Sequence, residues 1–104
     1  MSDRINILKS FIAEDPDDPF NYYALALELK ATAREECKSL LLKLVMDFPD
    51  YLPSYYQLAL LHEKSNEFHK AVEYTQKGIG LAIQQNDRKT LAELKQLLSQ
   101  LEDE

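Results

Sequence analysis

Apolar residues recur along the whole chain with the spacing of a helix. Near the N-terminus they fall at Ile5, Leu8, Phe11 and Ile12, which places them on one side of a helix. Later segments show comparable stripes, and short turns separate them. The pattern predicts six helices, at about residues 2–15, 19–29, 35–47, 53–64, 67–85 and 88–101.

Two of the expected helix starts carry capping signals. Asp18 and Pro19 supply a capping side chain and a proline at the first helical position. Asn86 tolerates a left-handed backbone at the end of one helix, and Asp87 can cap the next. These signals favour long helices joined by short connections.

A six-residue motif occurs twice. Residues 22–27 read YYALAL and residues 55–60 read YYQLAL, so five of the six positions are identical at an offset of 33. A period near 33 residues is typical of stacked helical hairpins. The same register aligns Phe11 with Leu44, so the first helix resembles the second half of an earlier repeat.

The repeat organises the chain as one all-α domain over residues 1–104. Six helices amount to three hairpins, which is the usual minimum for a self-supporting stack. The expected parts are a half-repeat helix at 2–15, repeat 1 at 19–51, repeat 2 at 52–85 and a C-terminal capping helix at 88–102.

The repeats place aromatic and small residues at regular sites. In the first helix of repeat 2 these are Tyr55, Leu58, Ala59 and His62, and in its second helix Phe68, Ala71 and Gly78. In repeat 1 the corresponding residues are Tyr22, Leu25, Ala26, Leu29 and Cys37, with Pro49 at the end. This arrangement resembles the tetratricopeptide repeat, a two-helix unit of about 34 residues.

Repeat 1 departs from the family pattern. Leu44 stands where a small residue is usual, and the turn at residues 30–34 lacks the family's glycine and is one residue short. The resemblance implies a right-handed stack of antiparallel helical hairpins, a tetratricopeptide-like α-solenoid. It also implies a non-enzymatic scaffold that binds peptides or proteins.

The charge of the chain limits the partners that we expect. The formal net charge is −6 and the isoelectric point is near 4.9, so nucleic acid and anionic membranes are not expected partners. The single cysteine excludes an internal disulfide and fits a reducing compartment. No signal-peptide pattern or long apolar run is present, so we expect a cytoplasmic protein.

Few residues suggest chemistry. Cys37, His62 and His69 are the candidates for a nucleophile, a base or a metal site, and no two of them have a known motif spacing. His62 falls on the inner side of its helix, where a core histidine is the simpler interpretation. We therefore expect no enzyme, no cofactor and no metal, with a small enzyme using Cys37 or His62 as the remote alternative.

The outer side of the helices that carry the tyrosine pairs is the stronger candidate for function. In stacked hairpins these helices line a concave surface, so their outer stripes would form an apolar partner-binding groove. The predicted groove residues are Phe20, Tyr23, Leu27, Tyr56, Leu60 and Lys64. Monomers rarely leave such a patch open.

Three interpretations of the groove compete. It binds a protein or peptide segment, it pairs with a second copy of the chain, or the protein's own terminal helix covers it. Some tetratricopeptide domains hold acidic C-termini with lysines and asparagines, but the sites here carry tyrosines and leucines. An acidic tail is therefore not the expected ligand. The terminal helix, with Leu91, Leu94, Leu98 and Leu101, is expected to cap the last repeat.

Overall fold

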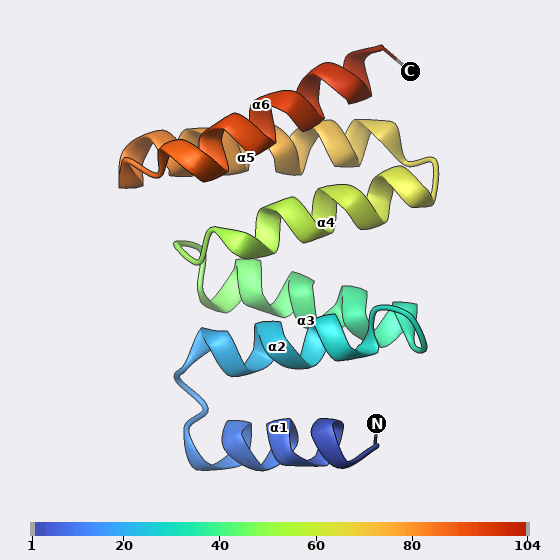
Figure 1. The fold of residues 1–104 in the computed structure, drawn as a ribbon, viewed down its shortest axis with the longest axis vertical. Helices are drawn as coiled ribbons and strands as arrows, with labels where there is room; N and C mark the ends of the chain where they lie inside the picture. The colour runs from blue at the N-terminus through green and yellow to red at the C-terminus, as the bar shows by residue number, and fades with distance from the viewer. Residues whose placement is uncertain (1, 104) are drawn as a thin grey trace. The chain divides into compact units, whose positions relative to one another are not determined.

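The structure is a computed structural model that describes residues 2–103, so Met1 and Glu104 lie outside the described residues. Every regular element in this range is an α-helix, which confirms the all-α fold class (Figure 1). The helices are α1 (Ser2–Glu14), α2 (Pro19–Leu29), α3 (Arg34–Asp47), α4 (Pro53–Lys64), α5 (Phe68–Gln85) and α6 (Arg88–Glu102).

The helices group into two compact units. The first contains α1 to α3 and ends at Tyr51, and the second begins at Leu52 and contains α4 to α6. This boundary falls where the sequence placed the border between its two repeats. A single domain over residues 1–104 stays a prediction, and each unit is described by itself below.

In the first unit α2 packs against both α1 and α3. The Asp18 carboxylate accepts a hydrogen bond from the Phe20 N–H at 3.0 Å, and Pro19 begins the helix, so the predicted cap is confirmed. The core residues are Leu8, Tyr22, Ala24, Leu25, Ala26, Leu29, Cys37, Leu41 and Leu44. An ion pair of 3.2 Å between Arg4 and Glu28 joins α1 to α2 at the surface.

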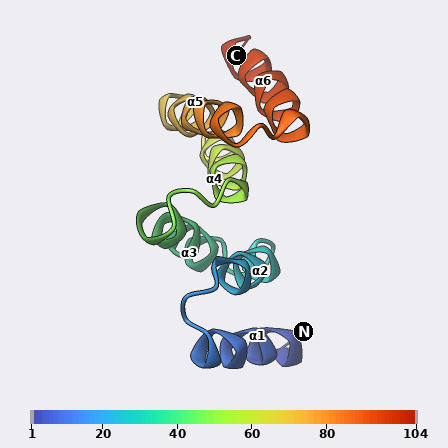
Figure 2. The same cartoon turned by 90° about the vertical axis from the view of Figure 1, so that its left-hand side faces the viewer.

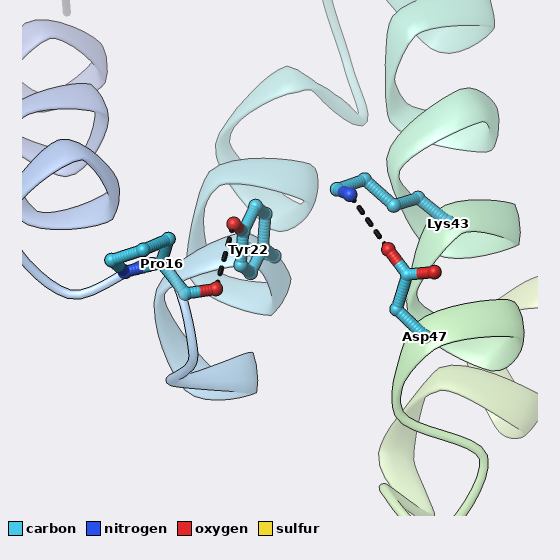
Figure 3. A network of polar contacts seen from close by, with 4 residues as sticks. All are labelled: Pro16, Tyr22, Lys43 and Asp47. Carbon is cyan, nitrogen blue, oxygen red and sulfur yellow. Dashed lines mark hydrogen bonds and ion pairs between the residues drawn. The ribbon is translucent and has the colours of Figure 1, made fainter.

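Tyr22, the first residue of the first tyrosine pair, fixes the corner before α2 (Figure 3). Its hydroxyl donates a hydrogen bond of 2.9 Å to the Pro16 carbonyl, and its ring centroid lies 5.9 Å from that of Phe48. One side chain thus joins the α1–α2 connection to the end of α3. Tyr55, its repeat equivalent, is also buried. The first tyrosine of each pair is therefore a core residue.

In the second unit α5 lies against both α4 and α6 (Figure 2). Asn86 ends α5 with a φ of 59°, and the Asp87 N–H donates to the Ala82 carbonyl at 2.9 Å. The Asp87 carboxylate in turn accepts a hydrogen bond from the Thr90 N–H at 3.0 Å. Asp87 therefore bonds the end of α5 through its N–H and caps α6 through its side chain. The predicted stop-and-cap pair is confirmed.

The terminal helix α6 covers the core of the second unit. The leucines that it buries are Leu94, Leu97 and Leu101, whereas Leu91 and Leu98 are half-buried. Leu94 and Leu101 of the expected stripe are thus buried, and a small rotation of the helix turns the buried side from Leu91 and Leu98 toward Leu97. Gly78 explains the close approach of α5 and α6, because a Cβ there would lie 3.0 Å from a methyl carbon of Leu94.

Two residues that we expected to face inward are exposed. Phe11 is 44% exposed although its repeat equivalent Leu44 is fully buried, and Phe68 is 36% exposed at the start of α5. Phe11 differs from Leu44 because α3 packs on α2 within its own hairpin, whereas α1 has no preceding helix in the described chain. None of the helices in residues 2–103 is both long and apolar enough to cross a membrane.

Candidate partner-binding surface

The outer side of α2 exposes two large apolar side chains. Phe20 is 57% exposed and Leu27 is 40% exposed, and Tyr23 lies between them in sequence. Leu27 follows Phe20 by seven positions, which is about two helical turns, so both side chains leave the same side of α2. We call these three residues the α2 face.

Tyr23 is held more firmly than its neighbours on the α2 face. It is half-buried, and its ring meets that of Tyr51 edge-on, with centroids 5.6 Å apart and planes at 62°. Burial raises the pKa of the Tyr51 hydroxyl, and the neighbouring Tyr23 and Asp18 raise it further. The ring of Tyr23 is therefore part of a fixed aromatic pair, while Phe20 and Leu27 are open to solvent.

The outer side of α4 carries the other three predicted groove residues. Tyr56 and Leu60 are half-buried against a core cluster that includes Leu97 and Leu101 of α6, and Lys64 is exposed. The terminal helix thus covers part of this side, which was one of the three interpretations of the sequence. We call Tyr56, Leu60 and Lys64 the α4 face. It is not an open apolar stripe.

A hollow of about 300 Å³ lies between α4 and α6 beside the α4 face. It is lined by Tyr56, Glu93, Gln96, Leu97 and Gln100. Its three polar residues on α6 were not among the predicted groove residues. Their spacing of three and four residues, beside the buried leucines, was the signal that could have identified them. Side-chain amides both donate and accept hydrogen bonds, so the glutamines of this hollow can pair with backbone N–H and C=O groups.

The structure therefore places three predicted residues together on α2 and three on α4. Their union into one groove stays a prediction, because the α2 face belongs to the first unit and the α4 face to the second.

Comparisons with known proteins agree with the helical repeat. No family model matches the chain, and neither does any curated protein sequence. A solution NMR structure of a tetratricopeptide repeat domain protein from Salinibacter ruber matches with 36% identity and a TM-score of 0.80. That match covers 86% of this chain and 91% of the other. The chain belongs to the tetratricopeptide repeat family.

Two further matches extend the comparison. A crystal structure of a tetratricopeptide repeat domain protein from Salinibacter ruber is 35% identical over 82% of this chain and 97% of that one, with a TM-score of 0.78. MamA has a TM-score of 0.68 at 22% identity, over 98% of this chain and 58% of that one, which shows the fold alone. The tetratricopeptide repeat protein described here is thus a helical-repeat module of the protein-interaction class.

His62 of this tetratricopeptide repeat protein is a core residue. It is 2% exposed, its Nδ1 lies 3.1 Å from a carboxylate oxygen of Glu67, and its ring stacks on Tyr74 with centroids 5.4 Å apart. Its Nε2 is buried without a hydrogen-bond partner. The His62 ring of α4 therefore contacts Glu67 at the start of α5 and Tyr74 about two turns further along α5.

Cys37, a residue of α3, is buried in the core of the first unit. Burial raises the pKa of its thiol, and the nearby Lys30 ammonium lowers it by a smaller amount. A thiol of this kind is a poor nucleophile, because the thiolate is the reactive form. Over residues 2–103, no group of three histidine, cysteine or carboxylate residues is arranged to hold a metal ion.

Proposed function

We propose that this tetratricopeptide repeat protein binds a segment of another protein, with the α2 face as its principal contact. The observation that carries the proposal is the exposure of Phe20 and Leu27 on one side of a single helix. Both side chains lose contact with water when a partner covers them. Full burial of such a side chain contributes about 1.5–3 kcal/mol, and these two are already partly covered, so each contributes less.

The pattern of the α2 face fits a peptide that lies along the helix. Residues at intervals of three and four form one continuous strip, in which Tyr23, paired with Tyr51, lies between the exposed Phe20 ring and the exposed Leu27 methyl groups. A rigid aromatic pair adds contact area without a large loss of side-chain freedom on binding. The strip therefore suits apolar side chains of an extended or helical segment.

The α4 face contributes a different type of contact in this proposal. Tyr56 and Leu60 are half-buried under α6, so little apolar area is left for a partner. The adjoining hollow presents the amides of Gln96 and Gln100, which can bond the main chain of a bound segment. Taken separately, the first unit thus offers apolar contacts on α2, and the second unit offers polar contacts between α4 and α6.

Two exposed positions of the first unit give a direct test. Phe20→Glu with Leu27→Glu places charges on the α2 face without touching the core, because both side chains are exposed. Met46→Glu is the matched control, since Met46 is 80% exposed on α3. Circular dichroism should show an intact helical fold in both variants. We expect affinity capture from native lysate to lose its specific partner only with the double variant, and retention of the same partner refutes the proposal.

A second copy of the chain is the competing occupant of this surface. Light scattering over a concentration series separates the two. A mass that rises with concentration in the wild type and in Met46→Glu, but not in Phe20→Glu with Leu27→Glu, assigns the face to homodimerisation. A constant monomer mass leaves the face to a different protein.

A further inference from the structure

A groove of the first unit borders the start of α2. We infer that this groove binds an arginine side chain of the partner segment; the inference rests on the proposed function and names the partner's chemistry. Its volume is about 380 Å³, and it is lined by Pro19, Asp47, Phe48, Pro49, Asp50 and Tyr51. We call it the proline groove. The lining comes from the first residue of α2, the end of α3 and the four residues after it.

The walls of the proline groove are apolar and stiff. Two prolines with fixed backbone angles and two aromatic rings surround it, so its shape depends little on flexible side chains. Such walls accept the planar face of a guanidinium, which stacks on rings and is only weakly hydrated. The compact, strongly hydrated ammonium of a lysine gains less from them.

The charge at the proline groove is negative. Asp47 and Asp50 line it, and the Asp18 carboxylate acts on the Tyr51 hydroxyl and helps to raise its pKa. The sequence has no lysine or arginine between Lys9 and Lys30, and none from residue 44 to the end of the first unit. The segments around the α2 face and the groove therefore supply more carboxylates than cations, with Lys43, which pairs with Asp47, as the neighbouring cation. Charge complementarity selects a cationic partner group.

One groove carboxylate already pairs with a cation of the chain itself, the Lys43 ammonium, as Figure 3 shows. The Lys43 ammonium lies 2.7 Å from an oxygen of Asp47 and 5.5 Å from the centroid of the Tyr22 ring. A carboxylate and an aromatic ring thus hold the charge together. The proline groove presents the same two kinds of group, with Asp50 added to Asp47 and the rings of Phe48 and Tyr51 as its walls.

The Lys43–Asp47 pair does not close the groove to a second cation. Both side chains are about half exposed, so the pair is screened by water and contributes little. A carboxylate has about four lone-pair sites, so one that binds Lys43 can also accept from a guanidinium.

The proline groove continues the α2 face. Pro19 precedes Phe20 in the first turn of α2, and Tyr51 of the groove holds the ring of Tyr23. A partner segment on Phe20 and Leu27 therefore reaches the groove with a neighbouring residue. The expected partner has apolar residues with an arginine next to them.

The inference can be tested with ¹⁵N-labelled protein and three short synthetic peptides. They share a leucine-flanked sequence and differ at one central position, which is arginine, lysine or citrulline; citrulline keeps the shape of arginine without its charge. We expect the arginine peptide to shift the backbone amide signals of Phe20, Asp50 and Tyr51. Its affinity should exceed that of the citrulline peptide about fivefold to tenfold, and the difference should shrink at high salt.

Two variants locate the effect. Asp47→Asn with Asp50→Asn should weaken the arginine peptide about fivefold to tenfold and leave the citrulline peptide unchanged. Glu35→Gln with Glu36→Gln is the matched control, because it also removes two exposed carboxylates, and Glu36 lies about 16 Å along α3 from Asp47. It should bind both peptides as the wild type does. Asp18 is left in place because it caps α2.

Three results overturn the inference: equal affinity for the arginine and citrulline peptides, an unchanged affinity in the double asparagine variant, or no shift at Asp50 and Tyr51 with any peptide. The proposed function fails in a different way. If Phe20→Glu with Leu27→Glu binds all three peptides as tightly as the wild type does, the α2 face is not the binding surface, whatever the groove binds.

Discussion

Cys37 and His62, two of the three side chains considered for reactive chemistry, are buried and used for packing, whereas His69 is exposed. Cys37 is buried in the core of the first unit, and His62 stacks on Tyr74 while it contacts Glu67. The sequence indicated both roles, because each residue falls on the inner stripe of its helix. It could not show that Nε2 of His62 has no partner, since that depends on every neighbour of the ring.

The first residue-scale prediction concerns the Cys37 thiol. Its pKa is raised by burial, so little thiolate is present at neutral pH, and access to the sulfur is blocked. We expect native protein to react with iodoacetamide far more slowly than protein in denaturant, where the thiol is free. Mass spectrometry of timed samples measures both rates. Equal rates would contradict the burial and restore Cys37 as a candidate nucleophile.

The two glycines of α5 should respond oppositely to substitution. A Cβ added at Gly80 would have no atom within 4 Å, so Gly80→Ala should raise the free energy of unfolding by about 0.5–1 kcal/mol. At Gly78 the added carbon meets Leu94 at 3.0 Å and the Tyr55 Cβ at 3.2 Å, so Gly78→Ala should lower it. Urea denaturation of both variants measures the difference, and the reverse order would contradict the packing of α6.

At the scale of elements, the junction between α5 and α6 depends on two adjacent residues. Asn86 adopts the left-handed backbone, and Asp87 accepts hydrogen bonds from both the N–H and the hydroxyl of Thr90. Both functions follow from local chemistry that the sequence displays. Capping signals of this kind made the helix positions predictable.

The Asp87 cap should make the stability of the protein depend on pH in acid. Hydrogen bonds from the Thr90 backbone N–H and hydroxyl lower the pKa of this carboxyl. The folded state thus binds the proton less tightly than the unfolded chain does, so the stabilisation is present above the ordinary aspartate pKa and is lost as the pH falls through the folded value. Asp87→Asn keeps a capping side chain without the titration. As the pH is lowered below about 4, the melting temperature of this variant should fall less than that of the wild type. Parallel curves of melting temperature against pH would contradict the assignment.

Which side of a helix is buried was less predictable than where the helix lies. Repeat register equates Phe11 with Leu44, yet one is 44% exposed and the other fully buried. Burial depends on whether a neighbouring helix is present, and period alone does not contain that information. In the same way, α6 buries Leu97 and leaves Leu98 half-buried, with Leu94 packed over Gly78.

The rotation of α6 gives a further prediction at this scale. Leu97 is 3% exposed and packs with Ala59 and Ala71, so Leu97→Ala should lower the free energy of unfolding by about 2–5 kcal/mol. Leu98 is half-buried on the adjacent side, so Leu98→Ala is the matched control and should cost less. Chemical denaturation of the two variants compares them. A larger loss for Leu98→Ala would restore the stripe expected from the sequence.

On the scale of the whole molecule, the two copies of the tyrosine motif serve different surfaces. In the first unit Phe20 and Leu27 stay open, whereas in the second unit Tyr56 and Leu60 are half-buried against the leucines of α6. The sequence predicted the same strip on both helices because the motifs are nearly identical. The difference arises because α6, the helix after the second repeat, packs beside α4. The polar hollow lined by Gln96 and Gln100 was missed for the same reason.

We propose that the α2 face receives a segment of a partner protein. The most direct test is amide shift mapping of the ¹⁵N-labelled protein with the binding segment of a captured partner. We expect the amides around Phe20, Tyr23 and Leu27 to shift and those around Met46 to stay in place. Shifts confined to the region of Met46, with α2 unchanged, would contradict the account.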